Sequence, residues 1–272
     1  MTFFRNGLTV AVIGAALLGG AAFAQQPAAQ AATYEPKVGQ SGKDVVWVPT
    51  PQTLVDRMLD MVKLTPADRL VDLGSGDGRT VITAAKRGAT ARGIEFNPDM
   101  VALSRRAAAA EGVSKRATFE EGDIFKSDFS RATVITMFLL PELNVRLRPT
   151  LLKMPPGTRI VSNSFSMDDW KPDETANVAE GCTSWCTAYK WVVPARVAGT
   201  WKLGERELVL AQTYQMLEGS VRDGQSVSTL SDARMDGARI QFSIGQQHYV
   251  GQVEGNTMRG TVDGGARWTA TR

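Results

Sequence analysis

The sequence predicts an α/β protein: a doubly wound parallel sheet followed by a small antiparallel β module. Residues 70–87 have the pattern of a short buried strand, a glycine-rich turn and a helix. Strand-like and helix-like runs then alternate as far as residue 164, which is typical of a parallel sheet covered by helices. After Pro194 only short alternating runs follow, separated by turn dipeptides, and these indicate an antiparallel sheet.

The composition is that of an ordinary globular protein. The chain has 272 residues, of which 43% are apolar and 22% are charged, enough for one large domain and one small domain. The net charge is only +3, and no block of Lys and Arg stands out. A dedicated nucleic-acid surface is therefore not expected.

The N-terminus has the features of a secretory signal peptide over residues 1–24. Arg5 precedes an apolar run, and Ala22-Phe23-Ala24 provides small residues at the cleavage positions. The run is too short and too rich in glycine to favour a stable membrane span, although an uncleaved anchor is the alternative. Both interpretations predict a periplasmic or secreted protein. Residues 25–44, rich in Ala, Gln, Pro and Gly, are expected to be a linker.

The folded domain is predicted to begin at Val45. Residues 44–48 precede Pro49-Thr50-Pro51, so an extended segment is expected there. Thr53 is positioned to cap an amphipathic helix over residues 54–63.

The turn after the first strand spaces its three glycines as G-x-G-x-G over residues 74–78. Dinucleotide sites have G-x-G-x-x-G, and here Arg79 stands where the last glycine would be. Asp72 and Asp77 also bring negative charge to the turn, whereas a pyrophosphate requires bare N–H groups. The turn is therefore predicted to bind an amino group, a sulfonium or sugar hydroxyls.

Acidic residues also follow the next two predicted strands. Glu95 ends a strand over residues 91–94, where a carboxylate is placed to accept hydrogen bonds from ribose hydroxyls. The strand over residues 117–121 leads to Asp123 and the apolar Ile124, which are suited to the edge and face of an adenine. The other predicted elements of this domain are helices over 99–111 and 143–153, strands over 132–137 and 159–164, and a hairpin of 175–179 with 187–193.

These segments resemble the cofactor half of class I S-adenosylmethionine-dependent methyltransferases. The matching segments are VDLGSGDGR (71–79), GIEFNP (93–98) and EGDIF (121–125). VPTP (48–51), TVITMFLLPELN (133–144) and LRP (147–149) further resemble the small protein-lysine methyltransferases, which include the mitochondrial enzymes acting on the ATP synthase c-subunit and the adenine nucleotide translocase. The resemblance covers about residues 45–194.

The resemblance implies a Rossmann-like seven-stranded sheet over 45–194, S-adenosylmethionine as cofactor, and a protein side-chain amine as acceptor. The implied cofactor-binding residues are Asp72, Gly74, Ser75, Gly76, Asp77, Glu95, Phe96, Asp123, Ile124 and Phe138. The implied walls of the substrate pocket are Trp47, Thr50, Leu140 and Pro141. For Trp47, ordinary core packing is an equal alternative.

The methyl acceptor is expected at the end of the fourth strand, which is apolar except for Glu142 and Asn144. An apolar wall lowers the pKa of a lysine amine by desolvation, and Glu142 could orient the amine or accept its proton. Glu142 and Asn144 are therefore the candidate catalytic residues. The alternative for Glu142 is that it only caps the following helix.

Cys182 and Cys186 are the only cysteines. Together with a secretory signal they predict a disulfide that closes a small hairpin loop, with free thiols as the alternative. Two cysteines and the distant His248 fall short of four metal ligands, so no metal site is expected.

Residues 195–272 are predicted to form an antiparallel sheet or small barrel without helices. Its predicted strands are 197–203, 208–217, 226–230, 238–244, 248–254, 257–262 and 267–271, with hairpin signals such as Asp223-Gly224 and Asp236-Gly237 between them. Trp201, Tyr214, Tyr249 and Trp268 could line a binding face, although aromatic residues in a small sheet usually form its core.

Two interpretations of function remain open at this stage. In the first, the chain is a methyltransferase acting on a protein side chain, and the β module recruits or shields the substrate. In the second, it is an extracytoplasmic protein that binds S-adenosylmethionine, a nucleoside or a partner protein without catalysis. The complete set of acids, Asp72, Glu95 and Asp123, favours the first. The predicted location favours the second, because S-adenosylmethionine is made in the cytoplasm.

Overall fold

The structure, a computed structural model, describes residues 1–4, 7 and 34–272. Residues 34–272 form one compact unit. Most of the predicted signal peptide and the first part of the predicted linker lie outside the described residues. In the described part of the chain, no helix is long and apolar enough to cross a membrane.

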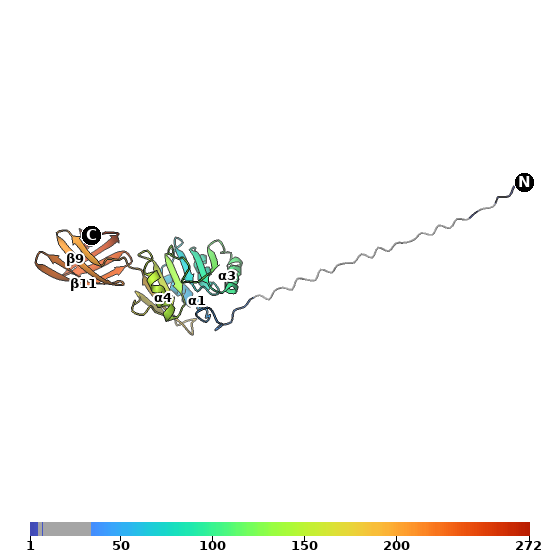
Figure 1. Ribbon diagram of the computed structural model, residues 1–272, viewed down its shortest axis with the longest axis horizontal. Helices are drawn as coiled ribbons and strands as arrows, with labels where there is room; N and C mark the ends of the chain where they lie inside the picture. Colours follow the sequence, from blue (N-terminus) through green and yellow to red (C-terminus); the bar gives the residue numbers. More distant parts are fainter. Residues whose placement is uncertain (5–6, 8–33) are drawn as a thin grey trace. The chain divides into compact units, whose positions relative to one another are not determined.

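Seven strands form a mixed sheet in the order β3-β2-β1-β4-β5-β7-β6 (Figure 1). The parallel strands are β1 (Arg69–Leu73), β2 (Thr90–Glu95), β3 (Ala117–Glu121), β4 (Val134–Met137) and β5 (Arg159–Asn163). The antiparallel strands at one edge are β6 (Glu174–Asn177) and β7 (Thr187–Val192). The prediction of a Rossmann-like seven-stranded sheet is confirmed. Its strand order reverses between β1 and β4, and ligands of open α/β sheets bind beyond the carboxyl ends of the strands at such a point.

Helices cover both faces of the sheet. They are α1 (Gln52–Met61), α2 (Arg79–Lys86), α3 (Pro98–Ala110) and α4 (Pro141–Leu151). Successive residues of β1 contribute to different cores: Leu70 packs with α1, α2 and α3, whereas Val71 packs with Leu147 of α4. This division follows from the pleat of a strand, which points neighbouring side chains to opposite faces.

The start of α1 differs from the sequence prediction. The helix begins at Gln52 directly after Pro51, and the carbonyl of Pro51 accepts the N–H groups of Leu54 and Val55. The predicted cap, Thr53, lies inside the first turn, and its hydroxyl donates instead to the carbonyl of Gly181 (3.2 Å). Pro51 takes the N-cap position in an extended conformation (φ −54°, ψ 140°), to which its ring restricts φ, and it has no side chain that could cap the helix.

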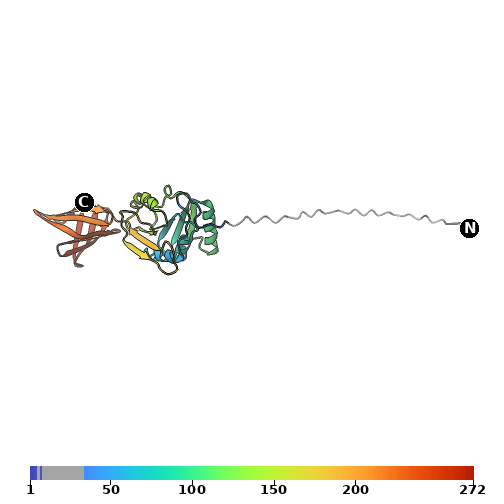
Figure 2. The ribbon, with the colours of Figure 1, turned by 90° about the horizontal axis from the view of Figure 1, so that it is seen from below.

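The C-terminal strands close into an eight-stranded antiparallel barrel, coloured orange to red in Figures 1 and 2. They are β8 (Gly199–Leu203), β9 (Arg206–Thr213), β10 (Met216–Asp223), β11 (Ser226–Asp236), β12 (Arg239–Ile244), β13 (Gln247–Glu254), β14 (Thr257–Val262) and β15 (Ala266–Thr271). Trp201, Tyr249 and Trp268 are buried in its interior with Phe242. These three aromatic residues therefore belong to the core of the barrel, which is the usual place for aromatic residues in a small sheet.

One strand of the barrel was not predicted. The run 208–217, predicted as a single strand, is divided into β9 and β10 by a turn at Tyr214 and Gln215. Tyr214 adopts a φ of +55°. Because neither turn residue is Gly, Asn, Asp or Pro, the composition gives no turn signal here.

This turn contacts the segment that follows β5. The ring of Tyr214 stacks on Trp170 with the ring centroids 5.7 Å apart, and its hydroxyl donates to Asp169 (3.0 Å). The side chain of Gln215 accepts the indole N–H of Trp170 (3.0 Å) and donates to the carbonyl of Lys171 (2.9 Å). Tyr214 therefore differs from Trp201, Tyr249 and Trp268: it packs against the segment that follows β5 and is not part of the barrel core.

Candidate active site

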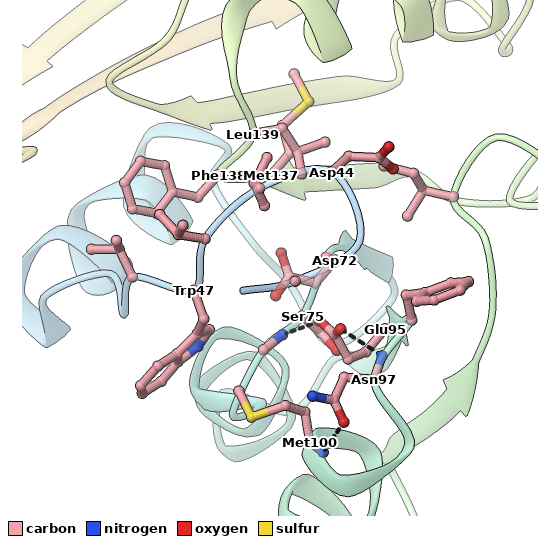
Figure 3. Close-up of a pocket in the computed structure, with 18 of the residues that line it drawn as sticks. Asp44, Trp47, Asp72, Ser75, Glu95, Asn97, Met100, Met137, Phe138 and Leu139 are labelled. Carbon is pink, nitrogen blue, oxygen red and sulfur yellow. Dashed lines mark hydrogen bonds between the residues drawn. The ribbon is translucent and has the colours of Figure 1, made fainter. Parts of the chain in front are cut away.

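A cavity of about 510 Å³ opens at the carboxyl ends of the parallel strands (Figure 3). Its walls come from residues 40–50, from the segments that follow β1, β2, β3, β4 and β5, and from the loop between β6 and β7. Its volume lies in the range of small-molecule sites, and its position is the topological switch point of the sheet.

The glycine-rich turn after β1 forms one wall. Gly74, Gly76 and Gly78 have φ values of +78°, +53° and +81°, a region that strains any residue with a side chain. A Cβ atom on Gly76 would also lie 2.6 Å from Nε1 of Trp47. The glycine therefore allows Trp47 to pack across the turn, so Trp47 combines a packing role with a place in the cavity wall (Figure 3).

Asp72 lies at the end of β1 and is only 6% exposed. The hydroxyl of Thr136 donates to its carboxylate (2.6 Å). Burial raises the pKa of Asp72 to about 7, and repulsion from Glu95 and Asp77 acts in the same direction, while the Thr136 bond opposes it. In the described residues, no Lys, Arg or His forms an ion pair with Asp72. A buried carboxylate on the wall of a cavity without a cationic partner fits a cationic ligand such as S-adenosylmethionine.

Glu95 is fixed across the mouth of the glycine turn. One carboxylate oxygen accepts the N–H of Gly76 (2.9 Å), and the other accepts the N–H of Asn97 (2.9 Å). Each oxygen retains a further lone pair. The carboxylate, at the last residue of β2, is thus held in place and still able to accept hydrogen bonds from ribose hydroxyls.

Asp123 has a partner that the sequence analysis did not predict. Its carboxylate pairs with Lys43 (2.7 Å), which holds the pKa of Asp123 below its usual value. The Lys43 ammonium also lies over the ring of Phe96, 5.0 Å from its centroid. Residues 40–44, placed in the linker by their composition, are therefore bound across the cavity and line it.

The cavity brings together all ten residues predicted to bind the cofactor. One of them has a partner within the protein, because the carboxylate of Asp77 bonds to the guanidinium of Arg79 (2.6 Å). Arg79 in turn donates to the carbonyl of Thr50 (2.9 Å). Asp77 therefore lines the cavity as one member of an ion pair with Arg79.

The predicted substrate-pocket residues divide into two groups. Trp47, Thr50 and Leu140 line the cavity, whereas Pro141 lines a second depression together with Glu142. Pro141 is the first residue of α4, which begins two residues earlier than predicted. Neither Pro141 nor Glu142 lines the cavity.

The two candidate catalytic residues do not reach the cavity. Glu142 is exposed in the first turn of α4, where its charge complements the helix dipole, and it makes no capping hydrogen bond. Asn144 is fully buried, and its amide donates to the carbonyls of Phe165 (3.1 Å) and Ser166 (3.2 Å). Asn144 therefore fixes the segment after β5, and the structure supports no direct catalytic role for either residue.

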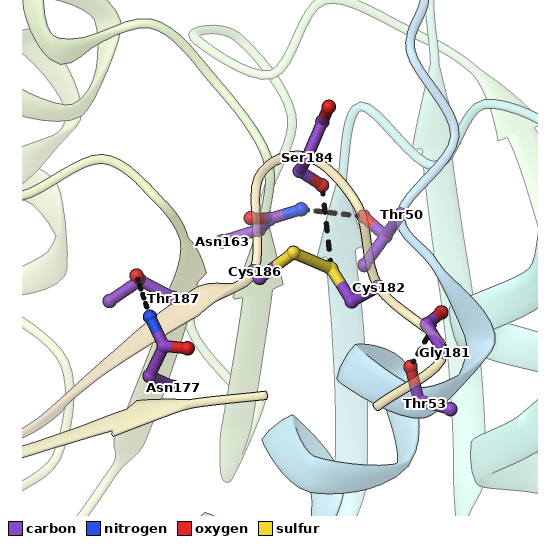
Figure 4. Close-up of a disulfide and its surroundings, with 9 residues drawn as sticks. All are labelled: Thr50, Thr53, Asn163, Asn177, Gly181, Cys182, Ser184, Cys186 and Thr187. Carbon is purple, nitrogen blue, oxygen red and sulfur yellow. Dashed lines mark hydrogen bonds between the residues drawn. A yellow bond between two sulfur atoms is a disulfide. The ribbon is translucent and has the colours of Figure 1, made fainter. Parts of the chain in front are cut away.

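Sequence analysis missed two aromatic residues that line the cavity, Phe165 and Trp185. Phe165 follows β5, and Trp185 lies between Cys182 and Cys186, which the structure joins in a disulfide (Figure 4). A tryptophan enclosed between two cysteines is the one sequence signal that could have indicated this loop. Within the described residues, no group of three or more His, Cys, Asp or Glu is placed to hold a metal.

Comparisons with known proteins agree with this geometry. The family model described as "ANTKMT methyltransferase domain" matches residues 72–174. A protein-lysine N-methyltransferase of Saccharolobus islandicus is 41% identical over 152 residues, which are 55% of this chain and 94% of that relative. The human lysine N-methyltransferase of the ATP synthase c-subunit is 36% identical over 128 residues, 47% of this chain and 54% of the human protein. The chain thus spans about half the length of the human relative.

A solved structure shares the fold of the sheet domain. The crystal structure described as an RNA methyltransferase from Salinibacter ruber, in complex with S-adenosylhomocysteine, is 45% identical. It superposes with a TM-score of 0.52 and covers 55% of this chain and 96% of that one. The cofactor prediction and the enzyme prediction are therefore confirmed. This chain belongs to the family of S-adenosylmethionine-dependent methyltransferases that includes the protein-lysine methyltransferases of the ATP synthase c-subunit and of the adenine nucleotide translocase.

Proposed function

We propose that this chain transfers methyl groups to the side-chain amine of lysine in a protein. The observation that carries the proposal is that one cavity joins two chemically different ends. Asp72 and Glu95 make one end acidic, whereas residues 137–140 give the other an apolar wall. The names of the Saccharolobus and human relatives support lysine as the acceptor.

The apolar end suits an amine acceptor. A lysine amine attacks only as the neutral base, and desolvation by Met137, Phe138 and Leu139 lowers its pKa toward neutrality. The bound cofactor supplies an activated methyl group: the nitrogen lone pair forms the N–C bond, the S–C bond breaks with its electron pair left on sulfur, and the nitrogen then loses a proton to solvent. Positioning and desolvation supply most of the acceleration, so no nucleophile or base of the protein is required.

A methyl-transfer assay tests the acceptor. Purified protein is incubated with radiolabelled S-adenosylmethionine and, separately, with protein extract and total RNA of the native host. We expect label in protein, with a mass increase of about 14 Da per methyl group on lysine, and loss of labelling in Glu95→Ala. Glu254→Gln, an exposed acid on the barrel, is the matched control. Label in RNA alone would contradict the proposal and would agree with the description of the Salinibacter relative.

We also propose that the protein acts outside the cytoplasm. The signal-peptide pattern of residues 1–24 and the disulfide between Cys182 and Cys186 support this location. Cell fractionation with N-terminal mass analysis tests it. We expect an extracytoplasmic protein whose first residue is Gln25, and an intact N-terminus in the cytoplasmic fraction would exclude the proposal.

A further inference from the structure

We propose that Phe138, Phe165 and Trp185 form an aromatic wall that binds the alkyl chain of the acceptor and the methylated ammonium that each transfer produces. We further propose that the Cys182–Cys186 disulfide holds Trp185 in this wall. The inference rests on the proposed amine acceptor and deepens it by naming the residues that select it. We call this set of three residues the aromatic wall.

The three rings come from three separate segments and meet at the cavity. Phe138 follows β4, Phe165 follows β5, and Trp185 lies on the loop between β6 and β7. The ring centroids are 6.0 Å apart for Phe138 and Phe165, 5.2 Å for Phe165 and Trp185, and 6.1 Å for Phe138 and Trp185. All three residues line the cavity that holds the predicted cofactor residues.

The position of Trp185 suits contact with a ligand better than packing in the hydrophobic core. Its side chain is 46% exposed, whereas Trp170, Trp191 and Trp201 are fully buried. Its φ is +59°, a conformation that is strained for a bulky residue. Such strain persists only where the surrounding structure enforces it, and it is concentrated at ligand sites.

The loop that carries Trp185 is fixed by bonds on both sides (Figure 4). The disulfide closes a segment of five residues. Before it, the hydroxyl of Thr53 on α1 donates to the carbonyl of Gly181 (3.2 Å), and after it, the carbonyl of Cys186 accepts the N–H of Val178 (2.9 Å). Reduction by excess dithiol would convert the disulfide into two thiols and the reductant into its own disulfide. Without the bridge, the φ of Trp185 is free to relax.

The chemistry of the wall fits an alkylated ammonium. The segments that supply the rings line the cavity only with apolar side chains: Met137, Phe138, Leu139, Leu140, Leu143, Phe165 and Trp185. They bring no carboxylate to the cavity, so attraction for a cation at this wall comes from the faces of the rings. Rings attract an ammonium without hydrogen bonds, and they therefore tolerate a head group whose N–H atoms have been replaced by methyl groups.

The experiment measures binding of free trimethyllysine, in the presence of S-adenosylhomocysteine, by calorimetry. The neutral carbon analogue of trimethyllysine, which has the same shape, separates cation attraction from apolar packing. We expect the wild type to bind trimethyllysine at least about tenfold more tightly than the neutral analogue. We expect Trp185→Leu to lose this preference and Trp185→Phe to retain part of it. The double variant Cys182→Ser/Cys186→Ser and the reduced protein should both behave like Trp185→Leu.

Affinity for S-adenosylhomocysteine is the folding control, and it should stay within about twofold in every variant. Equal affinity for the two analogues in the wild type, or an unchanged preference in Trp185→Leu, would overturn the aromatic wall. An unchanged preference in the reduced protein would overturn the role of the disulfide. If the wild type prefers trimethyllysine but labels no protein in the methyl-transfer assay, the aromatic wall stands and lysine methylation is wrong.

Discussion

The hydroxyl of Thr136 donates a 2.6 Å hydrogen bond to the carboxylate of Asp72 inside the sheet. The two residues are register partners on β4 and β1, so the sheet itself sets their distance. The bond favours the charged form of Asp72, yet burial outweighs it and leaves the pKa at about 7. The protonation state of Asp72 is therefore sensitive to pH near neutrality.

Cofactor affinity should depend on pH through Asp72. A cation in the cavity favours the carboxylate, so binding below pH 7 is expected to release a proton, and affinity should rise with pH and level off above about 7. Calorimetry from pH 5.5 to 8.5 in buffers of different ionisation enthalpy measures both effects. In Asp72→Asn the cofactor affinity should be lower and almost independent of pH. If the affinity of the variant changed with pH as steeply as that of the wild type, the pH dependence would belong to another group.

The stability of the ligand-free protein should show the opposite dependence. The folded-state pKa of Asp72 lies above its unfolded value of 3.8, so its contribution to stability is fully present below about pH 3.8 and is lost as pH rises through about 7. Asp72→Asn should therefore be more stable than the wild type at pH 8, by up to about 4 kcal/mol. The difference should largely vanish near pH 4.5. Urea unfolding at the two pH values checks this, and a less stable variant at pH 8 would refute it.

Substitution of Gly76 should abolish cofactor binding. In Gly76→Val the side chain meets Trp47, and the φ of +53° adds backbone strain, so binding is expected to be lost with about 1–3 kcal/mol of stability. Gly112 is the matched control, since it has a φ of +68° and no atom lies within 4 Å of the position that a Cβ would take there. Comparison of Gly76→Ala with Gly112→Ala, by calorimetry and thermal unfolding, separates the clash with Trp47 from the backbone strain of a positive φ. Equal effects of the two substitutions on both measurements would exclude the clash.

Loss of the Lys43–Asp123 pair should loosen residues 40–50 over the cavity. The pair is partly exposed, with 34% and 15% of the two side chains accessible, so we expect Lys43→Met to weaken cofactor binding by no more than about fivefold. The loss should appear mainly as faster dissociation in stopped-flow measurements. Raising the salt concentration should weaken the wild type more than the variant. Lys37→Met is the control outside the cavity lining.

Glu142 and Asn144 should respond differently to mutation. Glu142→Gln is expected to keep kcat within about twofold, because its side chain lies outside the cavity. Asn144→Ala leaves the partly buried carbonyls of Phe165 and Ser166 without their donor and should cost about 1–3 kcal/mol of stability. A kcat loss of a hundredfold or more in Glu142→Gln, with unchanged stability, would restore its catalytic assignment.

Local signals in the sequence were sufficient to predict which residues meet at the proposed cofactor end of the cavity. The residues at the ends of β1 and β2 and just after β3 meet because the carboxyl ends of parallel strands lie at one edge, and this rule alone groups Asp72, Glu95 and Asp123. The glycine pattern then identifies the wall between them.

The acceptor end could not be predicted in the same way. Phe165 and Trp185 reach the cavity from segments without a motif, and only the fold brings them beside Phe138. Asn144 stands in an apolar stretch that suggested chemistry, yet its buried amide donates to two partly buried backbone carbonyls. The turn at Tyr214 and Gln215 contains none of the residue types that favour turns. The division of the run 208–217 into two strands is therefore visible only in the closed barrel.

Closure of the barrel also limits how another protein can recognise it. The barrel closes where β15 pairs with β8, through Ala270 with Leu203 and Thr271 with Lys202, so little strand edge is left to which a foreign strand could add. Recognition of this module is therefore expected mainly through the outward side chains and the hairpin tips, where charge and shape can vary without disturbing the ladder of backbone bonds.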